Sequence, residues 1–385
     1  MAGKSRIYFD YNASAPLLDD ARAAMIAVMD IDANPSSVHA EGRKARAVVK
    51  KARRQVAALV NANPDHVVFT SGATEAAALA LTPHYSMGRA PVNMSRLYVC
   101  AADHPCTLEG GSFRAEDRML FPVRDNGLVD LPALEQVVAL HDHAAGLPLV
   151  VCHFANNETG VIQPVDEISR LVKANRGVFV VDAVQAAGRL PIDISTGFAD
   201  YLILSSHKIG GPKGAGALVA FSDLLMPMPL IRGGGQERGH RSGTESPVNL
   251  AGFGQAAEHA LNSMDEWQDV AHLRDQLEEG IREVAPTSVF YAQGEKRLPN
   301  TIFFSLPGMK AETLQIALDL DGFATSPGSA CSSGKVGASH VLAAMGVQSG
   351  EGAIRLSLGL GNSAADVSDF LQKFAKIAER AASGE

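Results

Sequence analysis

Residues 201–212 read Tyr-Leu-Ile-Leu-Ser-Ser-His-Lys-Ile-Gly-Gly-Pro, and this stretch decides the fold. The apolar run at its start predicts a strand that is buried on both faces of a sheet. Such a strand delivers the residues that follow it to the carboxyl edge of the sheet, where α/β proteins bind their ligands. Lys208 stands at this edge, where partial desolvation lowers the pKa of a lysine and makes its amine a nucleophile toward carbonyl groups.

A second apolar run, residues 178–181, ends in Asp182, and Gln185 follows three residues later. Each of these features alone is common, because lone lysines are usually solvated and strand-end aspartates often cap the next helix. Together they are more specific. A lysine that can bind an aldehyde and an aspartate that can pair with a pyridinium nitrogen predict pyridoxal phosphate as the cofactor.

The composition is that of a globular protein. Of the 385 residues, 46% are hydrophobic and 20% are charged, and a chain of this length favours two domains. The net charge of −8 argues against a nucleic-acid surface as the main function. The N-terminus has no long apolar signal segment, and no apolar run reaches the roughly 18 residues that a membrane span needs. We therefore expect a cytoplasmic protein without membrane segments.

The segment from Arg43 to Arg54 is strongly basic, unlike the acidic chain as a whole. Apolar residues recur through this segment at helical spacing, which predicts an amphipathic helix with a solvated basic face. A docking face for an acidic partner remains the alternative. The basic residues are Arg43, Lys44, Arg46, Lys50, Lys51, Arg53 and Arg54.

The four cysteines, Cys100, Cys106, Cys152 and Cys331, form no CxxC pair, which predicts free thiols in a reducing compartment and no metal site. The first three lie in or beside apolar runs and are expected to be small core residues. Cys331 lies instead in residues 325–337, a stretch of small residues that predicts a mobile loop. The alternative is a flexible linker with an incidental cysteine.

Short apolar runs alternate with helical patterns from about residue 16 to residue 255, which predicts an α/β fold with a mostly parallel, doubly wound sheet. A helical stretch follows from about 255 to 284. The remainder alternates strand-like and helical segments as a smaller α+β unit. We therefore predict an N-terminal segment, residues 1–15, that packs with the small domain, a large domain, residues 16–258, and a small C-terminal domain, residues 259–385. The predicted strands are 67–69, 97–100, 149–154, 178–181, 201–204, 217–221, 288–292, 301–306 and 354–358, and the later helices are 311–320 and 364–382.

Two further segments suggest anion binding. Residues 67–70 run through Gly72, Ala73 and Thr74 into an alanine-rich helix, and the N–H groups at such a helix start suit a phosphate. The arginine of the strand-like run 354–358, Arg355, is either a carboxylate clamp or half of a structural ion pair. Residues 328–335 only approximate a nucleotide-binding loop, because one residue too many separates the glycines and Val336 stands where a magnesium-binding hydroxyl is needed.

Over residues 7–360 the chain resembles the cysteine desulfurases of the NifS/IscS type, which are fold-type I pyridoxal-phosphate enzymes of the class V aminotransferase group. The resemblance implies a large domain with a mostly parallel, seven-stranded sheet and a small domain that carries a mobile cysteine loop. Two departures are Pro327 and residues 76–78, where small polar residues are more usual. The matching stretches are 10–13 (Asp-Tyr-Asn-Ala), 34–39 (Asn-Pro-Ser-Ser-Val-His), 69–75 (Phe-Thr-Ser-Gly-Ala-Thr-Glu), 156–161 (Asn-Asn-Glu-Thr-Gly-Val), 181–185 (Val-Asp-Ala-Val-Gln), 205–208 (Ser-Ser-His-Lys), 238–244 (Arg-Gly-His-Arg-Ser-Gly-Thr) and 328–331 (Gly-Ser-Ala-Cys).

The resemblance also implies a role for each candidate residue. Lys208 would bind the cofactor aldehyde covalently, Asp182 would pair with the ring nitrogen, and Gln185 would bond the phenolic oxygen. His104 would stack on the ring and move protons, and Cys331 would accept sulfur. The remaining implied contacts are Ala73, Thr74, Ser205, His207 and, from the neighbouring subunit of a homodimer, Thr244 for the phosphate, with Asn157 for cofactor and substrate and Arg355 for the substrate carboxylate.

These roles imply a reaction in which L-cysteine becomes L-alanine and leaves a persulfide on Cys331. The sulfur would then pass to an iron–sulfur scaffold or to another sulfur-acceptor protein. Two alternatives share the fold: a selenocysteine lyase or another class V aminotransferase. A third alternative is a catalytically silent member that serves as a scaffold, although the presence of Lys208, Asp182 and Cys331 together counts against it.

Overall fold

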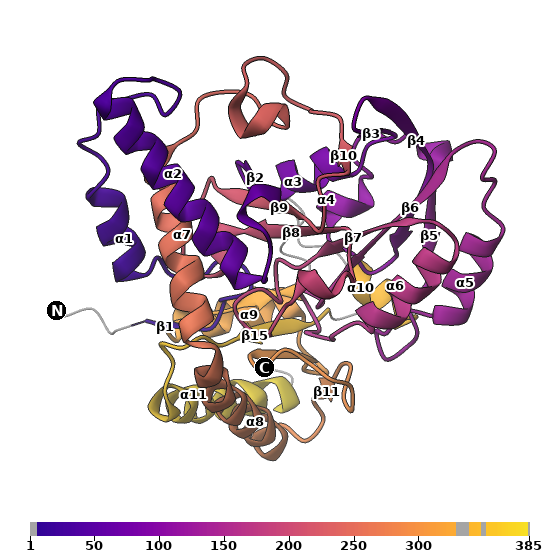
Figure 1. Ribbon diagram of the computed structural model, residues 1–385. Helices are drawn as coiled ribbons and strands as arrows, with labels where there is room; N and C mark the ends of the chain where they lie inside the picture. The colour runs from indigo at the N-terminus through magenta and orange to yellow at the C-terminus, as the bar shows by residue number, and fades with distance from the viewer. Residues whose placement is uncertain (1–5, 329–338, 348–351, 384–385) are drawn as a thin grey trace.

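The computed structural model describes residues 6–328, 339–347 and 352–383. A nine-stranded sheet with the order β10-β3-β4-β6-β7-β8-β9-β2 forms its centre, and β5 pairs with β4 at the side (Figure 1). The strands are β2 (Val67–Thr70), β3 (His84–Met87), β4 (Ala90–Cys100), β5 (Arg118–Phe121), β6 (Leu147–His153), β7 (Val178–Asp182), β8 (Tyr201–Ser205), β9 (Gly216–Ala220) and β10 (Leu225–Pro227). Strands β5, β4, β6, β7 and β8 run parallel, whereas β9 is antiparallel to both β8 and β2.

The predicted α/β fold and mostly parallel sheet are confirmed. The hairpin of β3 and β10, which extends the sheet beyond β4, was not predicted. Its strands contain few consecutive apolar residues, so the sequence pattern does not distinguish them from loops.

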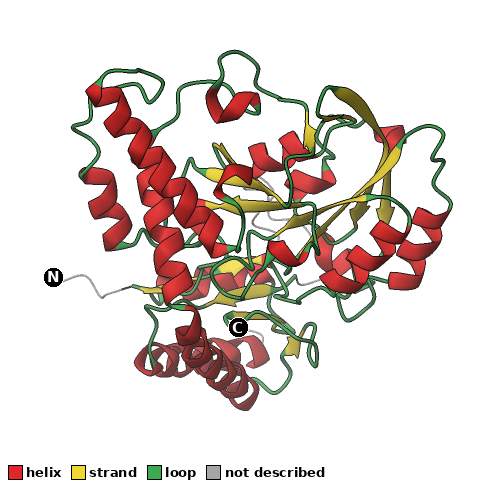
Figure 2. Ribbon diagram, viewed as in Figure 1, coloured by secondary structure: helices red, strands yellow, loops and turns green. Residues whose placement is uncertain are grey.

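The central strands are apolar throughout because helices cover both faces of the sheet (Figure 2). In β6, Val150 and Cys152 join the core on one face, and Leu149 and Val151 join the core on the other. The first core includes residues of α2 (Ala40–Leu59), α5 (Leu131–Ala139), α6 (Val165–Ala174) and α7 (Pro247–Asn262), and the second includes α3 (Ala73–Ala80). Two shorter helices are α1 (Asp19–Ile26) and α4 (Pro105–Leu108).

The C-terminal part builds a four-stranded sheet with the order β11-β12-β15-β14 and a third core. Its helices are α8 (Trp267–Val284), α9 (Ala311–Leu320), α10 (His340–Ala344) and α11 (Ala364–Ser383). Its strands are β11 (Val289–Phe290), β12 (Thr301–Ser305), β14 (Ser326–Pro327) and β15 (Ile354–Ser357). The N-terminal β1 (Ile7–Tyr8) pairs in parallel with β13 (Phe323–Ala324), so the first residues of the chain lie against the last third.

The helical stretch expected from about 255 to 284 is two helices, because a short 3-10 turn, Met264–Glu266, separates α7 from α8. Ser263 and Asp265 at this turn are weak helix formers, which is consistent with the break. The predicted boundary at residue 258 falls inside α7, and the division into domains stays a prediction.

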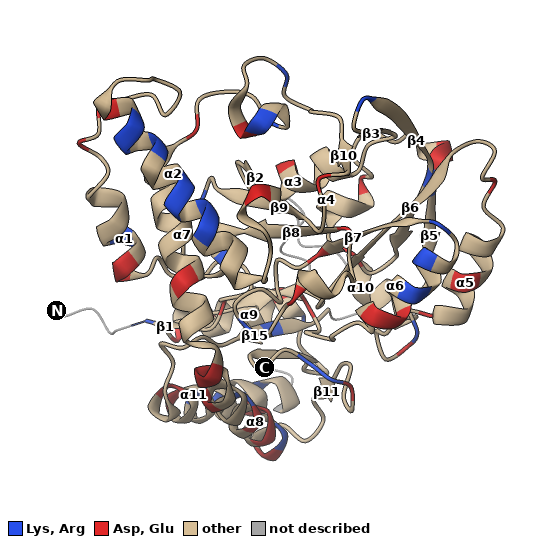
Figure 3. Cartoon of the chain, viewed as in Figure 1, with Lys and Arg blue, Asp and Glu red and all other residues tan. Residues whose placement is uncertain are grey.

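Helix α2 is the amphipathic helix that the sequence predicted. Ala45, Val49 and Val56 are buried, and basic residues recur along its length (Figure 3). Two basic residues are exceptions to the solvated face: Arg46 is half-buried and donates to the main-chain oxygens of Pro35 and Ser37, and Arg53 forms an ion pair with the buried Glu237. No helix in the described part of the chain is both long enough and apolar enough to cross a membrane.

We expect Gly254→Ala to destabilise the protein, although alanine is intrinsically the better helix former. A Cβ atom on Gly254 in α7 would lie 2.7 Å from the Cα atom of Ala52 in α2, where the two helices pack. Overpacking of this kind costs about 1–3 kcal/mol. Urea denaturation should show a loss of free energy of unfolding of this size. Gly235→Ala is the control, since its added methyl group would meet no atom within 4 Å. Equal stability of the two variants would contradict the packing argument.

Candidate active site

A cavity of about 510 Å³ lies at the carboxyl ends of the central strands. The last residues of β6, β7 and β8, which are His153, Asp182 and Ser205, all line it. Most of the predicted site residues meet here although they come from distant parts of the sequence. Those that line the cavity are Ala73, Thr74, His104, Asn157, Asp182, Gln185, Ser205, His207 and Lys208.

Lys208 ends the short 3-10 turn Ser206–Lys208 that follows β8. Its Nζ atom donates hydrogen bonds to the main-chain oxygens of Asn12, at 2.6 Å, and Ala13, at 3.0 Å. The same Asn12 oxygen accepts a hydrogen bond from Gln185 Nε2 at 3.0 Å. The N-terminal segment thus holds the amine and the neighbouring amide against one wall of the cavity.

Asp182 is the acidic group of the cavity floor. Burial raises the pKa of Asp182 to about 6, although the N–H group of Val184 donates a hydrogen bond to its Oδ1 atom and favours the charged form. A cationic donor in the cavity would lower this pKa again, because it would compensate the charge that burial disfavours. The carboxylate is therefore suited to a protonated ring nitrogen.

The start of α3 supplies the opposite end of the cavity. Its first residue follows Gly72, which provides no side chain to cap the N–H groups of the first turn. A Cβ atom on Gly216 of β9 would lie 2.5 Å from the carbonyl carbon of Gly72, so this glycine allows the helix start to approach the sheet closely. Thr74 and Lys213 line the same cavity. Uncapped N–H groups, a hydroxyl and a cation form an arrangement that suits a phosphate.

Two histidines of the cavity are neutral. His104 caps α4, and its Nδ1 atom accepts a hydrogen bond from the N–H group of Cys106 at 3.2 Å, so the proton of the neutral ring resides on Nε2. Burial, and then the charge of Lys208, lowers the pKa of His104 to about 4. The same two causes lower the pKa of His207 to about 4.

A buried pair that the sequence analysis missed, His153 and Asp103, supports the floor of the cavity. Gln163 fixes the tautomer of His153. The side-chain oxygen of Gln163 accepts from the N–H group of Val129, and its side-chain nitrogen donates to the main-chain oxygen of Gly127 and lies 3.1 Å from His153 Nε2. His153 Nε2 is therefore an acceptor, and the proton on Nδ1 donates to Asp103 Oδ1 at 2.5 Å. This chain fixes Asp103 directly before His104.

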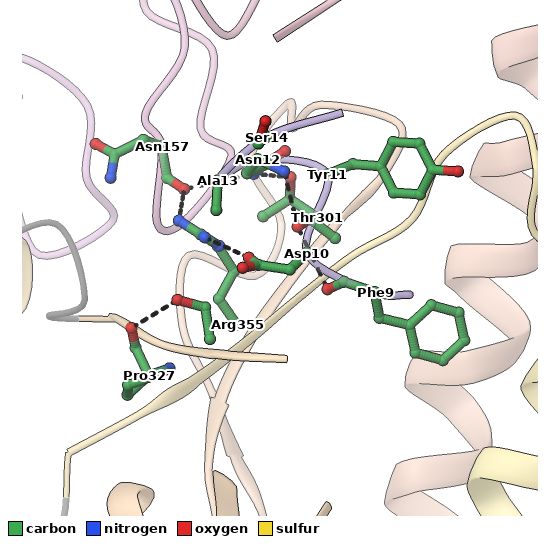
Figure 4. A network of polar contacts seen from close by, with 12 residues as sticks. Phe9, Asp10, Tyr11, Asn12, Ala13, Ser14, Asn157, Thr301, Pro327 and Arg355 are labelled. Carbon is green, nitrogen blue, oxygen red and sulfur yellow. Dashed lines mark hydrogen bonds and ion pairs between the residues drawn. The ribbon is translucent and has the colours of Figure 1, made fainter. Parts of the chain in front are cut away.

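Arg355 forms an ion pair, which was one of the two alternatives that the sequence left open. Its side chain is 1% exposed and donates to Asp10 Oδ1 at 2.8 Å and to the main-chain oxygen of Asn157 at 2.9 Å (Figure 4). Its Nε atom is buried and has no hydrogen-bond partner within the described part of the chain. Arg355 is not among the residues that line the cavity, so its contact with a substrate stays a prediction.

Thr244 is another predicted residue that does not join the cavity, because it is exposed and lies outside the lining. Its segment is fixed by the ion pair of Arg241 with Glu75 in α3. Cys331 lies outside the described residues.

Several lining residues were not predicted, among them Ser14, Cys106, His153 and Lys213. Cys106 was expected to be a core residue, but it faces the cavity because α4 begins at the edge of the sheet. The position of His153 directly after an apolar run was a signal that could have identified it. Lys213 follows a Gly-Gly-Pro turn, and nothing in that pattern distinguishes it from a surface lysine.

Comparisons with known proteins agree with this geometry. The aminotransferase class-V family model matches residues 7–370. The cysteine desulfurase IscS 1 of Archaeoglobus fulgidus is 36% identical, with 97% of this chain and 97% of the relative covered. The IscS-like cysteine desulfurase of Mycobacterium tuberculosis is 36% identical, with 95% and 94% covered.

Solved structures give the same result. A NifS-like protein from Rickettsia africae superimposes with a TM-score of 0.86 at 30% identity, with 97% of this chain and 99% of that chain covered. The central sheet with its covering helices is thus shared with a known structure over nearly the whole length. This chain therefore belongs to the class-V aminotransferase family and, within it, to the NifS/IscS cysteine desulfurase group.

Proposed function

We propose that this protein is a cysteine desulfurase that uses pyridoxal 5′-phosphate to convert L-cysteine to L-alanine and leaves the sulfur as a persulfide on Cys331. One observation carries the proposal: an amine, a buried carboxylate and an uncapped helix start line a single cavity. These are the three groups that recognise an aldehyde, a ring nitrogen and a phosphate.

The lining residues offer a suitable partner for each polar group of this cofactor. Lys208 would bind the aldehyde, Asp182 would hold a proton on the ring nitrogen, and Gln185 would bond the phenolic oxygen. The phosphate would accept hydrogen bonds from the start of α3 and from Ser205 and His207. The neutral His104 ring would stack on the pyridine ring, since a flat uncharged imidazole can lie on an aromatic face without paying the desolvation cost of a cation.

When bound, pyridoxal phosphate supplies an aldehyde for the substrate amine and a ring that accepts the electrons released at the substrate Cα atom. The side chains of the protein move the protons. Lys208 Nζ would take the Cα proton, because Lys208 lies at the wall of the cavity and a lysine amine can act as a general base. His104 could donate its Nε2 proton and afterwards regain one there, since its Nδ1 atom accepts a hydrogen bond from the main chain.

The sulfur step uses the thiolate of Cys331. A bond forms between this sulfur and the substrate sulfur, and the bond between the substrate sulfur and Cβ breaks, so that one cysteine and one thiol give one alanine and one persulfide. Cys106 also lines the cavity, but burial raises the pKa of its thiol and leaves little of the nucleophilic thiolate. Cys331 is therefore a better candidate than Cys106 for the thiolate that attacks the substrate sulfur.

The substrate carboxylate would be held by Asn157 and Arg355. The Asn157 side chain reaches the cavity, and Arg355 bonds the Asn157 main-chain oxygen. Among the described residues no acceptor meets the Nε atom of Arg355, so this guanidinium has a donor that a carboxylate could use.

We further propose a homodimer in the cytoplasm that hands sulfur to an acceptor protein, such as an iron–sulfur scaffold. Three observations support the dimer. Thr244 is exposed and away from the cavity of its own chain, its segment is fixed by ion pairs, and the nearby side chains of Leu224, Leu230 and Ile231 are apolar and exposed. The free thiols suit a reducing compartment.

The first test concerns the reaction and Lys208. The purified protein should release alanine and sulfide from L-cysteine in equal amounts under reducing conditions. Lys208→Ala should lower the rate by more than about a hundredfold, since the proton-transfer group is lost, and should lack the visible absorbance of lysine-bound cofactor. Lys44→Ala, in an exposed part of α2 away from the cavity, is the matched control and should retain that absorbance. Full turnover by Lys208→Ala would refute the proposal, and faster release of selenide from selenocysteine would favour a selenocysteine lyase.

The second test separates Cys331 from the cofactor chemistry. Cys331→Ser should bind pyridoxal phosphate and show a spectral change with L-cysteine, yet release almost no sulfide, because a hydroxyl is too weakly acidic to serve as the nucleophile. Mass spectrometry of the native protein after brief exposure to L-cysteine should find one added sulfur on Cys331. Sulfur found mainly on Cys106, or unchanged sulfide release by the serine variant, would contradict this role.

The third test concerns the shared site. Thr244→Ala should weaken cofactor affinity by about 1.5–3 kcal/mol, the usual contribution of a hydrogen bond to a charged group. Heterodimers of Lys208→Ala and Thr244→Ala chains should regain one intact site if Thr244 acts across the interface. Turnover no higher than that of the two parent variants would show that Thr244 does not act on the neighbouring subunit.

A further inference from the structure

A buried carboxyl group lies beside the cavity and has no role in the reaction described so far. Glu158 follows Asn157, and its side chain is almost wholly buried. Its Oε2 atom accepts a hydrogen bond from Ser339 Oγ, and a Cβ atom on Gly328 would lie 3.0 Å from the same oxygen. Gly328 and Ser339 flank residues 329–338, the segment that contains Cys331. Both flanks of that segment therefore meet at one carboxyl group.

The residue after Ser339 extends this contact toward His104. His340 Nε2 lies 2.8 Å from the main-chain oxygen of Asp103, and because a carbonyl oxygen only accepts, Nε2 carries a proton. The other ring nitrogen, Nδ1, lies 4.0 Å from Glu158 Oε1. The imidazole thus bridges the buried carboxyl group and the main chain that directly precedes His104.

The far side of Asp103 is already fixed. Its side chain accepts hydrogen bonds from the Nδ1 atom and the main-chain N–H group of His153, at 2.5 and 2.9 Å. His340 holds the carbonyl of the same residue. His153 in β6 thus restrains the side chain of Asp103, and His340 in α10 restrains its main chain. These contacts limit the movement of the neighbouring His104.

The electrostatic surroundings of Glu158 place its titration near neutral pH. Burial raises the pKa of Glu158 to about 7, although the hydrogen bond from Ser339 and the charge of Arg355 favour the carboxylate. The charged or titratable groups that face the pair are Arg355 beside Glu158, and Asp103 and His104 beside His340. Near neutral pH, Glu158 is poised between its charged and neutral forms.

We propose that Glu158 and His340 are positioning residues for desulfuration: Glu158 joins the two flanks of the segment that contains Cys331, and His340 connects this junction to the main chain that presents His104. The proposal rests on the proposed function. It assigns no contact with substrate to either residue. The pair instead restrains Ser339 and His340, at the start of α10, relative to the main chain before His104.

The test compares two substitutions of His340 of similar size. His340→Gln keeps an N–H donor for the Asp103 oxygen, whereas His340→Leu removes it. We expect His340→Leu to lower kcat for alanine formation by about ten- to a hundredfold, the scale of a misplaced catalytic group, with KM nearly unchanged and with an altered visible absorbance of the bound cofactor under His104. His340→Gln should retain most of the native kcat and most of the native visible absorbance. His66 also bonds a main-chain oxygen, that of Phe221, and does not line the cavity, so His66→Leu is the matched control.

A second measurement needs no turnover. In the cofactor-free protein, nitrogen-15 spectra of the histidine rings should show His104 with its proton on Nε2, and His340→Leu but not His340→Gln should shift or broaden these signals. Infrared spectra should show a protonated carboxyl group that grows as the pH falls through about 7 and is absent in Glu158→Gln. That variant can still accept from Ser339 but carries no charge toward His340.

These experiments distinguish failure of the proposed desulfurase function from failure of the positioning role of His340. If the native protein forms no alanine from L-cysteine, the proposed function fails, while the nitrogen-15 spectra still test the positioning. If His340→Leu matches the native protein in kcat and in the His104 signals, or if His340→Gln is impaired as much as His340→Leu, the positioning role is wrong. Melting temperatures of all variants distinguish a local effect from a general loss of folding.

Discussion

Burial of the central sheet on both faces is the constraint on which the rest of the structure depends. Between two apolar cores, a polar side chain within a strand would lack both water and partners, at a cost of several kcal/mol. The strands therefore remain apolar until their last residue, and polar groups begin where they end. Asp182, His153 and Ser205 occupy equivalent places at the carboxyl edge of neighbouring strands. The polar side chains of the cavity lie at this edge because the other positions of these strands are enclosed by the two apolar cores.

Polar groups at this edge are still buried, and the N-terminal segment supplies many of their partners. Asn12 bonds Lys208 and Gln185 through its main-chain oxygen and Thr301 of the C-terminal sheet through its side chain. Asp10 compensates the charge of Arg355 nearby. Breaking a buried ion pair by removing one partner typically costs about 3–5 kcal/mol. The first residues of the chain are thus as much a part of the site as the central sheet, and they join it to the C-terminal part.

The same burial determines the protonation states that the chemistry uses. It lowers the pKa values of His104 and His207 and raises those of Asp182 and Glu158. Each of these four shifts disfavours charge, so His104 and His207 are neutral imidazoles in a cavity that two lysines, Lys208 and Lys213, also line. A bound phosphate would favour a protonated His207, and a protonated ring nitrogen would favour a charged Asp182. Cofactor binding and protonation are therefore linked, and the protein without its cofactor differs electrostatically from the loaded enzyme.

The sequence by itself determined the α/β class, the central strands, the amphipathic helix of residues 40–59 and the position of Lys208 and Asp182 at the carboxyl edge of the sheet, because these features follow from local periodicity and from what must come after a buried strand. It also predicted the helix start after Gly72 that lines the same cavity. Only the tertiary structure decided that Arg355 forms an ion pair with Asp10, that Cys106 and Lys213 line the cavity, and that Glu158 lies beside Ser339 and His340. These contacts join residues that are distant in sequence, and no local pattern encodes them, because a buried charge selects its partner by geometry after the strands and helices have packed.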